Sequence, residues 1–287
     1  MHPVSASRLY AGAILVTITL ITAAAGTTRA EAASDGTVSR LVAATPAVVA
    51  GTPALATATP AVAAATVREP ASTTDAPSSD RADEALRALA DRVTRSSHSD
   101  ALRTAFTAYY NYRSANPDNV TKPYLYYVDM GLDNHTARGY VFDMDQLTVV
   151  EGPFTVAHGR GSARTRDGVP TSFSNRPGSN ATSLGLYLAQ ETYNFSGKSG
   201  GRRYTSVGLR MRGESGKFNS AARRRGIVAH GAPYVTAGQA GRSEGCPAME
   251  MKRAQRLLPM IANGGVVFIY SPKASDWLNS DPWILAD

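Results

Sequence analysis

Residues 226–249 read GIVAHGAPYVTAGQAGRSEGCPAM, and this stretch decides most about both the fold and the chemistry of the chain. Its apolar start predicts a strand that ends at His230, and a loop rich in glycine and alanine follows. Cys246 comes sixteen residues after this histidine, between Gly245 and Pro247. A thiol attacks a carbonyl carbon well only as the thiolate, so an imidazole within hydrogen-bond reach would make Cys246 a candidate nucleophile.

The neighbours of Cys246 suit that role. Gly245 has no side chain, so another group can approach the backbone closely. Pro247 suits the first position of a helix, which would place Cys246 at a positively polarised helix N-terminus and favour the thiolate. The backbone N–H groups of Gly245 and Cys246 are the candidate donors to an oxyanion.

Outward from this stretch, the chain after Pro123 has the character of a β protein. Short runs of β-branched and aromatic residues are separated by Gly, Asp and Asn turns, which predicts a mostly antiparallel sheet sandwich or a partly closed barrel. The expected fold class is therefore mainly β with flanking helices. The predicted strands cover residues 124–130, 139–144, 147–150, 154–158, 184–188, 204–211, 226–230 and 266–270.

Helices are predicted on either side of these strands. Apolar residues recur at helical spacing from Leu86 to Val93, and a second amphipathic helix is expected from about Ser99 to the residues before Asn116. Both should pack on the domain that follows.

A third helix is predicted from about residue 249 to residue 262. Pro259 should kink it or split it in two, because proline removes a backbone donor and crowds the preceding turn. The tail that carries Trp277 and Trp283 is expected to fold back over apolar surface.

The N-terminal part of the chain predicts export. Residues 9–25 form an uncharged apolar run, which Arg8 precedes and Ala-Glu-Ala at residues 30–32 follows, as in a cleavable secretory signal. An uncleaved membrane anchor is the alternative, although the run is shorter than the ~20 residues of a spanning helix. The predicted organisation is a signal peptide over residues 1–32, an Ala/Thr/Pro-rich disordered linker over 33–80, a helical segment over 81–118 and a catalytic domain over 119–287.

The cysteine content and the net charge limit the classes of function and of binding partner that fit the sequence. Cys246 is the only cysteine, and in an oxidising compartment an unpaired thiol is a liability unless it is buried and inert or is used. The formal charge of +7 favours anionic partners. Nucleic acid is disfavoured as a partner, because export removes most of the opportunity for the protein to meet it. The basic residues are also dispersed along the sequence, except at residues 223–225.

Five motifs carry a resemblance to a known family. The paired HGA and GRSEGCPA blocks are similar to the divergent branch of the YkuD-type L,D-transpeptidases, and the resemblance covers roughly residues 120–271. It implies a mixed β fold, a peptidoglycan stem peptide as acyl donor, no cofactor, and acylation by carbapenem-type β-lactams. It also implies that the Gly231 carbonyl orients the imidazole. The motifs are VAHGRGS (156–162), TSFSNRPGS (171–179), SLGLY (183–187), RGIVAHGAPYV (225–235) and GRSEGCPA (241–248).

Two positions depart from the family pattern. Glu244 stands where a histidine usually lies two residues before the nucleophile, and Ala248 stands where an arginine usually binds the substrate carboxylate. Arg242 is the candidate substitute for that arginine, with a solvated loop charge as the alternative. A carboxylate beside the thiol would disfavour the thiolate, so either Glu244 turns outward, toward Arg242 or the incoming acceptor amine, or the helix N-terminus and a protonated His230 outweigh its charge. The acceptor role is the favoured one.

Several other polar residues are candidates for the substrate groove. Ser243 belongs to the motif, and Ser172, Ser174 and Asn175 lie in a turn-rich segment where capping explains them equally well. His158 is a rival base, but a supporting role fits it better because no motif joins it to Cys246. A zinc site of both histidines and the cysteine is the less favoured alternative, since close-spaced ligand pairs are missing.

These features predict an exported acyltransferase of the periplasm or cell-wall space. In this hypothesis Cys246 attacks the amide before the terminal D-alanine of a tetrapeptide stem, His230 moves the proton, and an amine or water resolves the thioester. A papain-like or NlpC-like peptidase is the enzymatic alternative, although those families place the cysteine before the histidine. A catalytically silent peptidoglycan-binding module is the other alternative.

Overall fold

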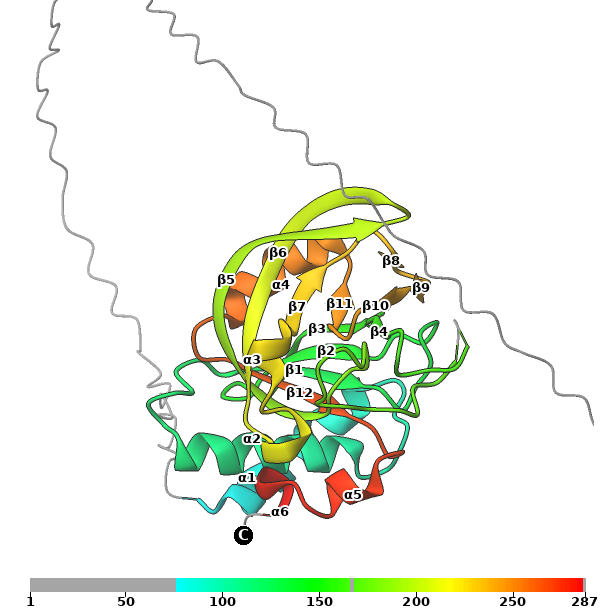
Figure 1. The fold of residues 1–287 in the computed structure, drawn as a ribbon. Helices are drawn as coiled ribbons and strands as arrows, with labels where there is room; N and C mark the ends of the chain where they lie inside the picture. Colours follow the sequence, from blue (N-terminus) through cyan, green and yellow to red (C-terminus); the bar gives the residue numbers. More distant parts are fainter. Residues whose placement is uncertain (1–75, 166–167, 286–287) are drawn as a thin grey trace, which may run out of the picture. The chain divides into compact units, whose positions relative to one another are not determined.

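The computed structural model describes residues 76–165 and 168–285 (Figure 1). The predicted signal segment, residues 1–32, and residues 33–75 of the predicted linker lie outside the described residues. None of the helices in the described ranges has both the length and the apolar character needed to cross a membrane.

An eight-stranded sheet with the order β11-β7-β6-β5-β12-β1-β2-β3 organises the described fold (Figure 1). The pairs β1–β12 and β7–β11 are parallel, and the other neighbours are antiparallel. The predicted class, mainly β with flanking helices, is confirmed, and the sheet is open rather than closed into a barrel. The strands of this sheet are β1 (Tyr124–Asp129), β2 (Gly139–Asp143), β3 (Thr148–Phe154), β5 (Gly185–Ser199), β6 (Arg202–Gly213), β7 (Val228–Gly231), β11 (Ala248–Met249) and β12 (Val266–Tyr270).

Two small sheets lie in the segments that connect these strands. The parallel pair of β4 (His158–Gly159) and β10 (Arg242–Ser243) joins two of the motifs that the sequence singled out. β8 (Val235–Thr236) and β9 (Gln239–Ala240) form a hairpin in the loop between His230 and Cys246.

Helices cover the middle of the large sheet. β2 and β12 are buried along their whole length, as expected for strands that are covered on both faces. The two N-terminal helices pack on the sheet as predicted, and Phe106 of α2 lies edge-on to Phe142 of β2 with ring centroids 5.5 Å apart. The helices are α1 (Ser78–Leu89), α2 (Ala101–Ala115), α3 (Ala222–Arg225), α4 (Met251–Ile261), α5 (Ser275–Leu278) and α6 (Pro282–Leu285), with 3-10 turns η2 (Ala90–Arg92) and η3 (Gly216–Phe218).

β5 and β6 form a hairpin that is much longer than the predicted strands 184–188 and 204–211. On the large sheet, β12 pairs only with residues 185–188 and β7 pairs only with residues 208–210. The outer part of the hairpin, residues 195–206, is therefore a two-stranded ribbon, which we call the distal ribbon. It arches over the sheet at the top of Figure 1.

The prediction that Cys246 lies at a helix N-terminus is wrong. Ala248 and Met249 form β11, paired with His230 and Gly231, and α4 begins only at Met251. Both residues of β11 are fully buried, so burial and strand pairing outweigh the preference of a proline for the first turn of a helix. Cys246 consequently gains nothing from the dipole of α4, which falls off beyond the first turn.

The predicted split of the third helix at Pro259 is wrong. α4 runs through Pro259 as one helix to Ile261, and the buried side chains of Leu258 and Ile261 anchor its last turn on either side of the proline. The tail folds back as predicted: Trp277 is buried beside the ring of Phe268, and Trp283 lies edge-on to Tyr112 with a centroid distance of 4.8 Å.

Candidate active site

Parallel pairing between β7 and β11 brings His230 beside the cysteine turn. His230 is in register with Ala248, and its N–H donates to the Pro247 carbonyl at 3.3 Å. The residue that follows Cys246 is thus hydrogen-bonded to the backbone of the histidine. His230 and the two residues that follow Cys246 become neighbours because β7 and β11 pair at one edge of the sheet.

The His230 imidazole is buried and neutral. Its side chain is 2% exposed, and the ring stacks on Phe195 of the distal ribbon with centroids 4.1 Å apart. Burial lowers the pKa of His230 to about 4, although the hydrogen bond to Gly231 acts to raise this pKa. Nδ1 lies 3.0 Å from the Gly231 carbonyl, which can only accept, so Nδ1 carries the proton and Nε2 keeps a free lone pair.

The thiol of Cys246 is half-buried and protonated at rest. Sγ lies 3.8 Å from the carbonyl of Gly226, to which the S–H donates. Burial raises the pKa of the Cys246 thiol, while a backbone hydrogen bond from Val228 and the charge of Arg225 act in the opposite direction. Gly226 can turn its carbonyl toward the sulfur because it adopts a left-handed conformation, φ 68°, at the end of α3.

The turn before the thiol is held by Ser243. Its hydroxyl donates to the Cys246 carbonyl at 2.6 Å and accepts the N–H of Gly245 at 3.1 Å. Gly245 has φ 126°, and a Cβ on it would lie 3.0 Å from both the Ala181 carbonyl and Ile227 Cδ1, so only glycine fits here.

This turn corrects the oxyanion prediction. The Gly245 N–H is already donated to the Ser243 hydroxyl, so it is not a free donor. Among the hydrogen bonds of the described residues, none uses the N–H of Cys246. Cys246 therefore supplies the remaining backbone donor next to its own sulfur.

Arg225 is a site residue that sequence reasoning missed. Its guanidinium donates to the carbonyls of Ser174 and Ala181, both at 2.7 Å, and to the Ser179 hydroxyl at 3.1 Å. The same positive charge lowers the pKa of the Cys246 thiol. Its place directly before the His230 strand was the one available signal, but in the sequence it belongs to a run of three arginines.

A family model described as L,D-transpeptidase catalytic domain matches residues 94–270, more than half of the chain. The chain belongs to the L,D-transpeptidase catalytic domain family. The resemblance found in its motifs is thereby confirmed.

Solved structures with similarity to this L,D-transpeptidase domain are distant in sequence. An L,D-transpeptidase from Mycobacterium smegmatis is 15% identical over 52% of this chain and 58% of that one, with a TM-score of 0.32. An L,D-transpeptidase from Stackebrandtia nassauensis is 13% identical over 68% of this chain and 92% of that one, with a TM-score of 0.33. The chain thus spans less than two thirds of the first structure. No curated protein matches it.

Glu244, one of the departures from the L,D-transpeptidase pattern, turns outward as expected but toward a different partner. Its two carboxylate oxygens lie 2.9 and 2.8 Å from Nε of Arg160, and both side chains are more than half exposed. The expected partner, Arg242, has an exposed side chain while its backbone pairs with His158 in the β4–β10 sheet. Arg160 belongs to the VAHGRGS motif, and only this small sheet reveals that it faces the cysteine motif.

His158 occupies a supporting position in the L,D-transpeptidase domain. The residue is fully buried, and its Nδ1 lies 3.0 Å from Nη2 of Arg138. Burial, together with the charges of Arg138 and Arg242, lowers the pKa of His158 to about 3. Within the described ranges, no group of three or more His, Cys, Asp or Glu side chains could hold a metal ion.

The polar candidates Ser174 and Asn175 of the 171–179 motif are bonded to other groups of the protein. Asn175 donates through Nδ2 to the Lys217 carbonyl at 3.0 Å and accepts the Ala221 N–H at 2.9 Å. The Ser174 hydroxyl accepts the Arg176 N–H. The Ser174 bond fits the capping interpretation, whereas the Asn175 bonds hold the motif against residues 217–221.

Proposed function

We propose that this L,D-transpeptidase domain is a cysteine acyltransferase that acts on peptidoglycan stem peptides. The observation that supports it best is the β7–β11 register, which sets a neutral imidazole beside the turn of a half-buried thiol. The proposed donor is a tetrapeptide stem, and the bond that breaks joins its third, diamino residue to the terminal D-alanine. We propose export to the periplasm or cell-wall space as the setting.

The first half-reaction forms a thioester. The S–H turns away from the Gly226 carbonyl, Nε2 of His230 takes its proton, and Sγ bonds to the carbonyl carbon of the scissile amide. The Cys246 N–H donates to the oxyanion, while Arg225 and the N–H of Val228 favour the thiolate. The tetrahedral intermediate collapses, His230 gives its proton to the amine, and D-alanine leaves.

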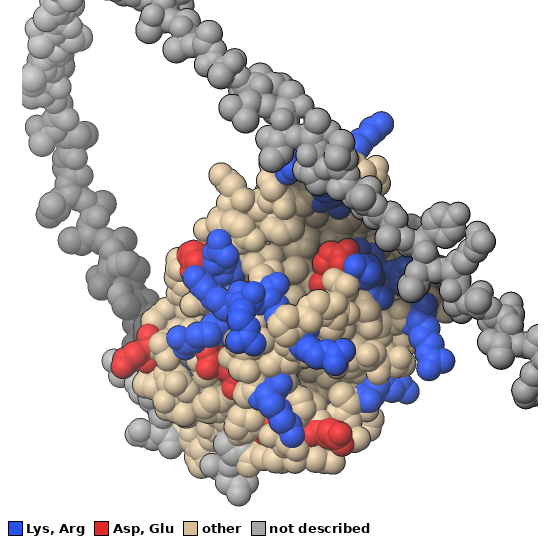
Figure 2. Space-filling model, viewed as in Figure 1, with Lys and Arg blue, Asp and Glu red and all other residues tan. Residues whose placement is uncertain are grey.

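The second half-reaction reverses these roles. An amine of a second stem loses a proton to His230 and attacks the thioester, which restores the thiol and leaves a 3-3 cross-link. Water in place of the amine gives a carboxypeptidase. The face shown in Figure 2 carries more Lys and Arg than Asp and Glu, which suits a carboxylate-rich polymer.

The test uses the full chain and a defined tetrapeptide-stem fragment, with mass spectrometry of the products. We expect D-alanine release from the wild type, none from Cys246→Ala, and a loss of most activity in His230→Ala. Retained turnover in a folded Cys246→Ala protein would refute the covalent mechanism. As a second readout, a carbapenem should add once to the wild type and not to Cys246→Ala, because the family resemblance implies acylation of the thiol.

A further inference from the structure

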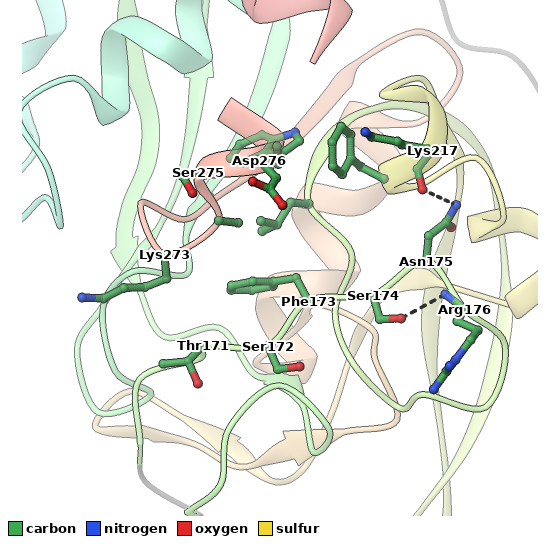
Figure 3. Close-up of a pocket in the computed structure, with 14 residues that line it drawn as sticks. Thr171, Ser172, Phe173, Ser174, Asn175, Arg176, Lys217, Lys273, Ser275 and Asp276 are labelled. Atoms are coloured by element: carbon green, nitrogen blue, oxygen red, sulfur yellow. Dashed lines mark hydrogen bonds between the residues drawn. The ribbon is translucent and has the colours of Figure 1, made fainter. Parts of the chain in front are cut away.

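A cavity of about 650 Å³ lies outside the cysteine turn. Its wall combines the 171–176 segment with residues 273–277 of the C-terminal tail, and with Lys217 and Phe218 of η3 (Figure 3). Neither Cys246 nor His230 is among its lining residues. The volume falls within the range of small-ligand sites in proteins.

The cavity has an apolar base and charged edges. Phe173, Leu184, Phe218 and Trp277 supply the apolar surface, and two of them, Leu184 and Trp277, are buried. In Figure 3 the carboxylate of Asp276 points toward the ring of Phe173. The cavity therefore combines an exposed carboxylate with apolar surface.

Side chains of both signs of charge line the cavity. In Figure 3, Lys217 and Lys273 lie on opposite sides of Asp276. Among the ion pairs of the described residues, none includes Asp276 or either lysine. The Lys217 ammonium lies 5.0 Å from the centroid of the Phe218 ring, which leaves it free to meet an anion.

We propose that this cavity is a second binding site, for a short zwitterionic peptide that carries a free amine and a free carboxylate. Asp276 receives the ammonium group, one of the two lysines that flank it receives the carboxylate, and the aliphatic part of the ligand lies on Phe173. A ligand with only one sign of charge would leave the opposite charge of the site without a partner. The binding site is additional to the proposed transferase chemistry.

The cavity shares a wall with the thiol site. The Ser174 carbonyl, in the 171–176 segment, accepts from Arg225, whose charge acts on Cys246. A ligand that contacts Phe173 therefore orders the same segment that Arg225 holds from the other side. Occupancy should slow amide hydrogen exchange in residues 171–176.

The experiment measures binding of L-lysyl-D-alanine to the full chain by calorimetry, after Cys246 has been alkylated so that the thiol site is blocked. We expect Asp276→Asn, and the double change Lys217→Gln with Lys273→Gln, each to weaken binding about tenfold, the effect of one lost charge-assisted contact. Lys198→Gln, an exposed lysine of the distal ribbon, is the matched control and should bind normally.

Two blocked probes test whether binding requires the carboxylate and the ammonium groups of the ligand. L-lysyl-D-alaninamide lacks the carboxylate and the Nα,Nε-diacetyl dipeptide lacks the ammonium groups, so both should bind more weakly than the parent. Equal binding of all three probes, or no loss in the Asp276→Asn protein, would overturn the proposal. D-alanine release by Asp276→Asn, measured separately, should stay at the wild-type level, so a failure here is distinct from a failure of the transferase proposal.

Discussion

At the scale of single residues, Arg225 connects the 174–181 segment to the sulfur of Cys246, the proposed nucleophile. It fixes two carbonyls of the 174–181 segment and places a positive charge near a thiol whose pKa burial raises. A lysine could supply the charge but not the planar fork that binds both carbonyls. The two roles can therefore be separated by substitution.

Arg225→Met should move the pH midpoint of Cys246 alkylation by iodoacetamide upward and slow alkylation several-fold at neutral pH, because the thiolate loses the stabilising charge of Arg225. Arg225→Lys should keep a midpoint closer to the wild type while hydrogen exchange in residues 174–181 increases. Arg223→Met is the control, since Arg223 is exposed and pairs with Glu191. Identical midpoints in all three variants would show that Arg225 acts only on the loop.

The sequence could predict the candidate pair of nucleophile and base but not the groups that surround it. Cys246 and His230 lie in blocks with a specific spacing, so the motif alone proposes them. Arg225 and Arg160 contact segments that lie tens of residues away in the sequence. No sequence pattern predicts which residue an exposed or half-buried arginine will contact. Ser243 was recognised as a site residue, but its bonds to the turn became visible only with the backbone in place.

At the scale of elements, the distal ribbon shapes the environment of His230, the proposed base. Phe195 covers one face of the imidazole, and burial is the main cause of the low pKa of His230. Phe195→Ala should admit water to that face, raise the pKa of His230 from about 4 toward its ordinary value, and move the acid limb of the pH–rate profile to higher pH. Activity near pH 5 should fall more than activity near pH 7.5.

The control for this change is Thr205→Ala, because Thr205 lies in the same ribbon and is exposed. Phe195→Leu keeps an apolar cover and should give an intermediate shift. An NMR titration of the imidazole in each variant checks the pKa directly. An unchanged acid limb in Phe195→Ala would mean that the strands, and not the ribbon, exclude water from His230.

The strand residues that the sequence did not predict have one property in common: they show no hydrophobic periodicity. Residues 190–203 of the hairpin are mostly polar or glycine, so they lack the alternation that signals a half-buried strand, and pairing between the two arms extends them regardless. β11 has only two residues, too few for any period, and its conformation is decided by burial against His230. Strands with apolar β-branched and aromatic runs, such as β1 and β12, match the prediction closely.

At the scale of the whole molecule, two buried histidines make the stability depend on pH. Burial lowers the pKa of His230 to about 4 and that of His158 to about 3, both below the ordinary value of an exposed histidine. Between about pH 6.5 and these values the unfolded chain binds protons that the folded chain does not. Their contribution to stability is thus fully present above pH 6.5 and is lost as the pH falls toward 3.

We therefore expect the urea midpoint of the wild type to fall between pH 7 and pH 4 by more than that of a His158→Gln, His230→Gln double variant. Carboxylates titrate in both proteins, so the difference between the two pH dependences isolates the histidines. Parallel curves would show that these histidines take up protons equally in the folded and unfolded states.

The edges of the large sheet have a consequence for self-association. β11, at one edge, is two residues long, and Ala157 already exchanges backbone hydrogen bonds with its Ala248. β3, at the other edge, shifts register against β2 and contains Pro153, which has no N–H to donate. A second copy of the chain thus meets no long, regular strand at either end of this sheet. Such blunted edges disfavour edge-to-edge growth into aggregates.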